Sequence, residues 1–183
     1  TRADILSVFT GIRPLVRSDS QQNTAAISRD HTIEVDRHGL VTITGGKWTT
    51  YRKIAEDIVN KAIAVHQLPN HKCVTEHLPI HGNKKNTESD FQNHLSIYGT
   101  DSKAILQLQE NEPELKEKLH PDYDYTLAEV VWAIREEMAT TVEDVLARRT
   151  RALFLDARES IRIAPEVASI LAKELKQDKE WIF

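Results

Sequence analysis

The sequence is poor in the residues that mark several special protein classes. It has one cysteine, 6 glycines and 6 prolines in 183 residues, which excludes a disulfide-stapled scaffold and a collagen-like repeat. Its 40% apolar content also excludes an intrinsically disordered chain. No apolar run approaches the roughly 20 residues that a membrane-spanning helix requires. What remains is a globular chain that is long enough to form a core.

The start of the chain lacks both an initiator methionine and a signal-peptide pattern. The chain begins at Thr1 and enters an apolar stretch, residues 5–9, almost at once. We therefore expect a fragment of a longer protein.

The sequence also lacks a strong charge of either sign. It carries 24 basic and 28 acidic side chains, a net charge of -4. Residues 1–66 hold 9 basic and 7 acidic groups, and residues 67–183 hold 15 and 21. Neither part has the positive field of a nucleic-acid-binding protein, so we expect no nucleic-acid partner. The acidic second part argues against electrostatic docking on anionic lipid.

The first third of the chain has the pattern of strands followed by a helix. Residues 7–12 are β-rich and end before Pro14. Residues 32–36 and 40–44 alternate apolar and polar around Gly39, which predicts a hairpin. After Gly45 and Gly46 the period changes to 3.6, which predicts an amphipathic helix from about residue 51 to 65.

The rest of the chain has helical patterns beyond a linker at 69–87. We expect helices at 88–98, 102–111 and 125–139. A capping box at Thr141 and Asp144 predicts another from about 142 to 155, and a last helix should carry Pro165 in its first turn. The predicted fold class is α+β, with a small hairpin and helix in 1–68 and an all-α domain in 88–183.

Three clusters in the first third could carry chemistry. Arg13 lies between a glycine–isoleucine pair and Pro14, where a stiff backbone can direct a guanidinium toward phosphate or carboxylate. Arg29 lies in a second basic cluster, residues 28–31. For Arg13, a surface arginine at a strand end is the alternative interpretation.

The third cluster begins at the glycine pair and is more specific. Two glycines allow close approach to the backbone, the helix start supplies free N–H groups, and Lys47 adds positive charge. Thr49 and Thr50 add hydroxyls, so an anionic or electron-rich ligand is favoured. The spacing matches neither a Walker loop nor a GxGxxG fingerprint. A plain strand-to-helix turn is the alternative.

Other candidates are weaker. Four histidines in or near the linker have no cysteine pair and no helix to present them, so we expect no metal site there; they are His66, His71, His77 and His81. The arginines of 148–151 have Asp144 and Asp156 close by, which indicates an ion-paired helix face. No catalytic triad and no general base is evident.

The clusters together resemble a known family. The runs GIRPLV, SRDH and TGGKWTTYRKIAEDIV are similar to the C-terminal part of FAD-dependent glycerol-3-phosphate dehydrogenase. The later run EEMATTVEDVLARRTRALFLDAR is similar to the signature of that family's helical C-terminal domain. The related FAD-dependent glycerol-3-phosphate oxidase shares these motifs.

The resemblance implies a role for each cluster. Residues 1 to about 66 would be the closing piece of a split FAD-binding fold, whose helix after Gly46 points its N-terminus at the flavin. It implies substrate contacts from Arg13, Arg29 and Lys47. A hydride would pass from C2 of sn-glycerol 3-phosphate to FAD, giving dihydroxyacetone phosphate, and electrons would pass to quinone. The implied flavin-contacting residues are Gly45, Gly46, Lys47, Trp48, Thr49 and Thr50.

The resemblance also implies what these residues do not hold. The GxGxxG fingerprint, most of the substrate cap and the proton acceptor are not in the sequence, so no catalytic residue is assigned and the isolated chain is expected to be inactive. The parent would lie on the cytoplasmic side, in peripheral contact with the cytoplasmic membrane, and could form a homodimer.

Three alternatives remain open from the sequence. An oxidase would use O2 in place of quinone. The helical part could be an interaction module for dimer or membrane-surface docking. The chain could also be an unrelated α-helical protein with a small hairpin.

Overall fold

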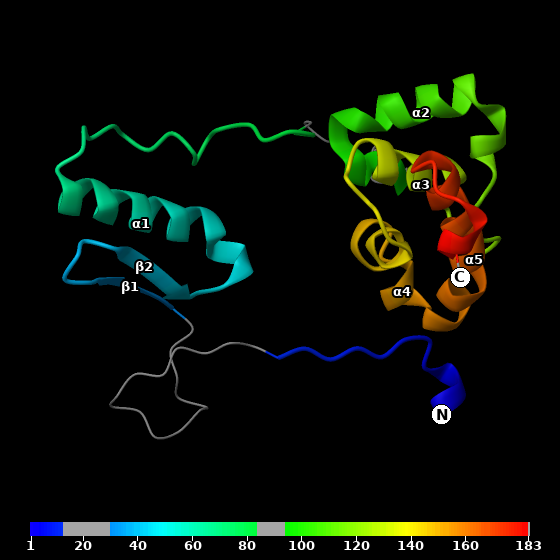
Figure 1. Ribbon diagram of the computed structural model, residues 1–183, viewed down its shortest axis with the longest axis horizontal. Helices are drawn as coiled ribbons and strands as arrows, with labels where there is room; N and C mark the ends of the chain where they lie inside the picture. The colour runs from blue at the N-terminus through cyan, green and yellow to red at the C-terminus, as the bar shows by residue number, and fades with distance from the viewer. Residues whose placement is uncertain (13–29, 84–93, 183) are drawn as a thin grey trace. The chain divides into compact units, whose positions relative to one another are not determined.

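The computed structural model describes residues 1–12, 30–83 and 94–182. The chain divides into two compact units (Figure 1). The hairpin unit is Gly11–Pro79, and the helical unit is Thr1–Thr10 together with Ile80–Phe183. The predicted α+β fold class is confirmed. Arg13, Arg29 and the first part of the predicted helix 88–98 lie outside the described residues.

The hairpin unit contains the expected two-stranded antiparallel sheet. Strands β1 (His31–Val35) and β2 (Val41–Gly45) pair with Ile33 opposite Ile43. Their turn is closed by Asp36, whose carboxylate accepts the backbone N–H groups of residues 38 and 40 at 2.8 Å. Gly39 has a φ of +87° in this turn, a backbone conformation that residues with a side chain rarely adopt. The predicted hairpin is therefore confirmed.

Helix α1 (Tyr51–His66) follows β2 and lies along the sheet (Figure 1). A short 3-10 turn, Trp48–Thr50, comes between the strand and the helix. The isoleucines of the sheet and of α1 are half-buried, other apolar residues such as Val59 are exposed, and no described side chain of this unit is fully buried. Because the described part of this unit buries no side chain fully, few contacts fix its geometry.

The helical unit has a true core. Helix α3 (Leu127–Arg135) is apolar on nearly every side and is buried among its neighbours, α2 (Ser102–Asn111) and α5 (Ala157–Glu174). A π-helix (Asp144–Arg149) and the short α4 (Ala152–Leu155) complete the core, together with 3-10 turns at His94–Asp101 and Pro113–Lys116. The main core cluster contains Val130, Ala133, Val145, Ala152, Val167 and Leu171, among others.

One buried carboxylate holds the start of α3 in place. Glu129 is fully buried, and its oxygens accept hydrogen bonds from the Thr126 backbone N–H at 2.8 Å and from Tyr98 Oη at 3.2 Å. His94 Nε2 lies 3.0 Å from the same carboxylate. Burial raises the pKa of the Tyr98 phenol, so this group stays protonated and donates. A buried carboxylate is tolerated because its donors replace lost hydration.

Several helix predictions need correction. Helix α3 ends at Arg135, four residues before the predicted end at residue 139. The described part of the predicted helix 88–98 is a 3-10 helix that continues to Asp101. Pro165 lies inside α5 and not in its first turn, because Asp156 caps the helix earlier by accepting the N–H groups of Arg158 and Glu159. The predicted helix 142–155 is interrupted, because Arg151 adopts a left-handed backbone with φ +60°. Residues 7–12 form no strand in this structure.

The N-terminal segment contacts the helical unit directly. The carbonyl of Leu6 accepts the N–H of Ala157 at 3.0 Å, and Ser7 Oγ donates to the carbonyl of Leu153 at 2.8 Å. The rings of Phe9 and Phe154 meet edge to face at 5.0 Å. The sequence places these residues with the strands, whereas here they lie against α4 and α5.

The capping box at Thr141 and Asp144 forms as predicted. Asp144 Oδ2 accepts the N–H groups of Thr140 and Thr141 at 3.0 Å, and the Asp144 N–H donates to Thr141 Oγ1 at 3.0 Å. The backbone N–H of Thr140 is the main cause that lowers the pKa of Asp144 to about 2.

Replacing Asp144 with alanine should lower the free energy of unfolding of the helical unit by about 1 kcal/mol, because the helix start loses its acceptor. Urea denaturation followed by circular dichroism measures this. The native pKa lies below the ordinary value of 3.8, so the stabilisation is complete above about pH 4 and is lost as the pH falls toward 2.

Glu143→Ala is the matched control, because Glu143 also pairs with Arg148 but makes no capping bond. Equal losses in the Asp144 and Glu143 variants would contradict the capping role.

Candidate functional site

The third cluster forms one open turn between β2 and α1. Gly45 and Gly46 have φ +79° and +86°, a region that favours glycine. The N–H and the hydroxyl of Thr50 both donate to the Lys47 carbonyl at 3.0 Å, which closes the 3-10 turn. The strand thereby ends and the helix begins within five residues of the glycine pair.

Gly46 is required for packing as well as for backbone conformation. A Cβ at this position would lie 2.5 Å from Ile54 Cδ1 and 3.5 Å from His31 Cβ. The backbone of Gly46 therefore rests directly on α1 and on the first residue of β1. This close approach lets the chain turn back on itself without moving the helix away from the sheet.

The outer side of the turn presents an aromatic pair and one cation. The Trp48 side chain is 87% exposed, and its ring stacks on that of Tyr51 at 5.8 Å with 29° between the planes. Lys47 is exposed and has no ion-pair partner among residues 1–12, 30–83 and 94–182. The first turn of α1 holds no acidic side chain, so positive potential at the helix start is not cancelled locally.

The next cations along α1 are neutralised by carboxylates one turn further on. Arg52 pairs with Glu56 at 3.0 Å and Lys53 pairs with Asp57 at 2.8 Å. The Glu56 carboxylate raises the pKa of Arg52, and the Lys53 ammonium lowers the pKa of Asp57. Lys47 is thus the free cation of this turn, and the arrangement suits an anionic or electron-rich ligand.

Comparison with known proteins identifies the family. Residues 41–181 match the model of the C-terminal domain of alpha-glycerophosphate oxidase. The chain belongs to this family. The predicted resemblance to glycerol-3-phosphate dehydrogenases is thereby confirmed.

Similar proteins with curated names are glycerol-3-phosphate dehydrogenases. The chain is 36% identical to a probable mitochondrial glycerol-3-phosphate dehydrogenase of Caenorhabditis elegans, over 95% of the chain and 27% of that protein. It is 34% identical to a protein of the same name from Dictyostelium discoideum, over 98% of the chain and 31% of that protein. It is 35% identical to the mitochondrial glycerol-3-phosphate dehydrogenase of Rattus norvegicus, over 95% of the chain and 26% of that protein. The chain therefore spans about a third or less of the length of these relatives.

The structure brings together one of the three clusters that carry the family resemblance. Gly45, Gly46, Lys47, Trp48, Thr49 and Thr50 occupy the single turn described above. Arg13 and Arg29 lie outside the described residues, so their place in the substrate site stays a prediction.

One residue near the turn was missed from the sequence. His31 belongs to the SRDH run, and it lies opposite Gly45 in the strand register. Its Nε2 lies 3.1 Å from Asp57 Oδ2 on α1. The hairpin alternation, extended back by one residue, could have placed His31 beside the glycine pair.

Several of the weaker candidates have structural partners. Arg148 pairs with Glu143 and Asp144, and Arg149 pairs with Glu137. His81 pairs with Asp101 at 2.7 Å. Within the described part of the chain, no cluster of histidine, cysteine and acidic residues could hold a metal ion. Among the described helices, none is both long and apolar enough to cross a membrane.

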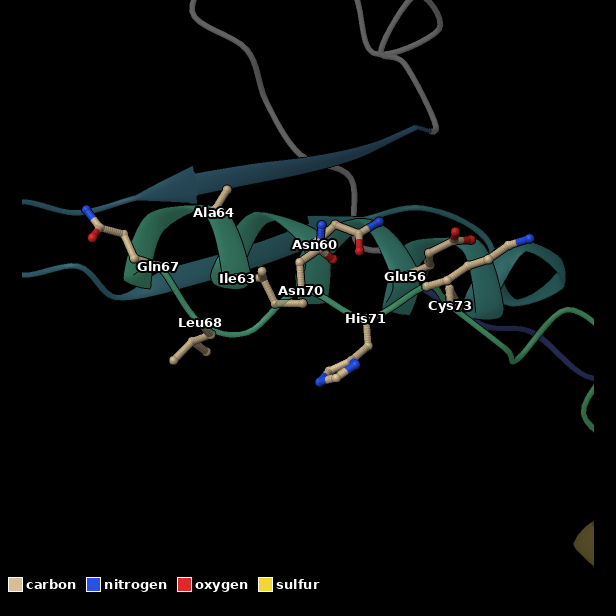
Figure 2. Close-up of a pocket in the computed structure, with 10 residues that line it drawn as sticks. Glu56, Asn60, Ile63, Ala64, Gln67, Leu68, Asn70, His71 and Cys73 are labelled. Carbon is tan, nitrogen blue, oxygen red and sulfur yellow. The ribbon is translucent and has the colours of Figure 1, made fainter.

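A groove of about 510 Å³ runs along the second half of α1, where the chain returns past the helix (Figure 2). It is lined by amide side chains such as Asn60 and Asn70, with His71 from the returning segment. Cys73 also lines it, with Sγ 3.1 Å from Thr75 Oγ1. No residue of the Gly45–Thr50 turn lines this groove, which lies beyond the first turn of the helix.

Gly46→Ala should weaken the hairpin unit by about 1–2 kcal/mol, because a non-glycine residue at φ +86° is strained and its Cβ would collide with Ile54. Hydrogen exchange of the α1 amides measures this loss of stability. The protection factors should fall by roughly 5- to 30-fold.

Gly11→Ala is the control, because a Cβ there meets no atom within 4 Å. Protection in Gly46→Ala that equals that of the control would show that the turn tolerates a side chain.

Proposed function

We propose that this chain is the C-terminal part of an FAD-dependent glycerol-3-phosphate dehydrogenase that oxidises sn-glycerol 3-phosphate to dihydroxyacetone phosphate. The observation that carries the proposal is the open turn of Gly45–Thr50, with its free lysine and helix start, in a chain of this family. The relatives' names support the substrate.

The residues of this turn fit a flavin. The glycine pair leaves the outer backbone free of side chains, and the exposed ring of Trp48 offers an apolar face to a planar ring system. Lys47 and the N–H groups at the start of α1 would stabilise the negative charge that develops on the ring system on reduction. When bound, FAD supplies the acceptor for the hydride from C2 of the substrate.

Arg13, Arg29 and Lys47 are proposed to bind the phosphate of the substrate. A guanidinium fork matches two phosphate oxygens, and an ammonium adds a compact charge. These cations would hold the substrate in one orientation, with C2 toward the flavin. The proton acceptor is expected outside this chain, and the isolated chain is expected to be inactive.

Quinone is the proposed electron acceptor, as the family resemblance implies for a dehydrogenase. Use of O2 is the alternative that the oxidase name of the family model suggests. Peripheral contact with a membrane and a homodimer through the helical unit remain predictions.

Arg13→Ala in the full-length protein should raise the KM for glycerol 3-phosphate by roughly 10- to 100-fold, as expected for loss of a charged hydrogen bond worth about 1.5–3 kcal/mol. Steady-state kinetics with a dye acceptor measures it. Arg37→Ala is the control, since Arg37 lies in the hairpin turn beside His38. An unchanged KM in Arg13→Ala would remove this arginine from the substrate site.

Lys47→Met should lower the reduction potential of the bound flavin, because a cation near the ring favours the reduced, negatively charged form. Spectroelectrochemistry of the full-length protein gives the potential. Lys61→Met on the exposed side of α1 should leave it unchanged, since Lys61 lies several turns from the helix start. Equal potentials for the two variants would exclude Lys47 from the flavin environment.

A further inference from the structure

The open turn that carries the proposed site has few contacts of its own. Lys47 and Trp48 are exposed, and the turn's own hydrogen bonds close only the 3-10 turn between Lys47 and Thr50. The hairpin unit contains no fully buried side chain among its described residues. The position of the turn therefore depends on what lies behind Gly46.

Gly46 packs against His31 and Ile54, and of these two residues only His31 can make a polar contact. His31 Cβ is 3.5 Å from the place where a Gly46 Cβ would be, and His31 is the strand partner of Gly45. The side chain of His31 reaches Asp57 on α1, with Nε2 3.1 Å from Oδ2. Both side chains are less than a third exposed, at 23% and 29%, so water screens this pair less than an open surface pair.

Asp57 is itself held on both oxygens. Oδ2 meets His31, and Oδ1 meets the Lys53 ammonium at 2.8 Å one turn earlier on the same helix. The Lys53 contact is local to α1. The His31 contact instead joins the first residue of β1 to α1, across the turn that connects β2 to α1.

We propose that His31 and Asp57 are positioning residues, which hold the Gly45–Lys47 turn at a fixed place on α1 and so set the orientation of the Lys47 ammonium toward the substrate phosphate. This inference rests on the proposed function for its kinetic consequence, but its structural consequence is independent of it.

Asp57→Ala tests the positioning role, and Lys53→Gln is its matched control. Hydrogen exchange of the Thr50 amide, which donates to the Lys47 carbonyl, should be at least fivefold faster in Asp57→Ala and unchanged in Lys53→Gln. Asp57→Asn should restore slow exchange, because its amide oxygen still accepts from His31. His31→Phe, which keeps a ring beside Gly46 but no donor, should behave like Asp57→Ala.

Kinetics of the full-length protein supply the second readout. The KM for glycerol 3-phosphate should rise about tenfold in Asp57→Ala and His31→Phe, with kcat within twofold of wild type, and Asp57→Asn should recover most of the affinity. Melting of the helical unit should not change, which checks that the variants are folded.

Two results would overturn the inference. Exchange of the Thr50 amide in Asp57→Ala that equals its exchange in Lys53→Gln would show that the pair does not hold the turn. Faster exchange with an unchanged KM would show a structural tie without a positioning role. A wild-type protein that does not oxidise glycerol 3-phosphate would refute the proposed function alone, and the exchange measurement would still decide whether the pair holds the turn.

Discussion

The contact between the Gly46 backbone and Ile54 is the constraint on which the site depends. Because the two meet where a Cβ would have no room, β2 can end directly on the helix that follows it. The helix start is then left exposed to solvent, with no side-chain cap and no acidic side chain in its first turn. A bulkier residue at Gly46 would push the strand and helix apart and would displace Lys47 with them.

The two units of the chain are stabilised in different ways. The helical unit buries apolar residues from several helices and satisfies the fully buried carboxylate of Glu129 with neighbouring donors. The hairpin unit has half-buried isoleucines and polar ties such as His31 with Asp57. A small unit with so little buried area has a low free energy of unfolding. A single polar contact therefore contributes a larger fraction of the interactions that fix its geometry than it would in the helical unit.

The sequence predicts the elements with strong periodicity and misses those decided by local competition. The alternation of apolar and polar residues predicts the hairpin, and the 3.6-residue spacing of apolar residues predicts α1, because each element has one apolar face with a regular period. Pro165 was misplaced because the Asp156 cap starts α5 earlier, and a proline is accepted inside this helix. The break at Arg151 has no sequence signal, since arginine rarely takes a left-handed backbone. The pairing of His31 with Asp57 joins residues 26 positions apart and depends on strand register.

Charge pairing along α1 explains how a chain of net charge -4 can present a positive turn. Arg52 and Lys53 would spread positive potential over the first turns of α1 if they were free, but Glu56 and Asp57 neutralise them. The remaining attraction for an anion is concentrated at Lys47 and at the backbone N–H groups of the helix start. Concentrated charge favours one ligand position over many, because potential falls steeply with distance in solvent. The proposed role, orienting one carbon atom of a substrate toward a flavin, would need this localisation more than a larger total charge.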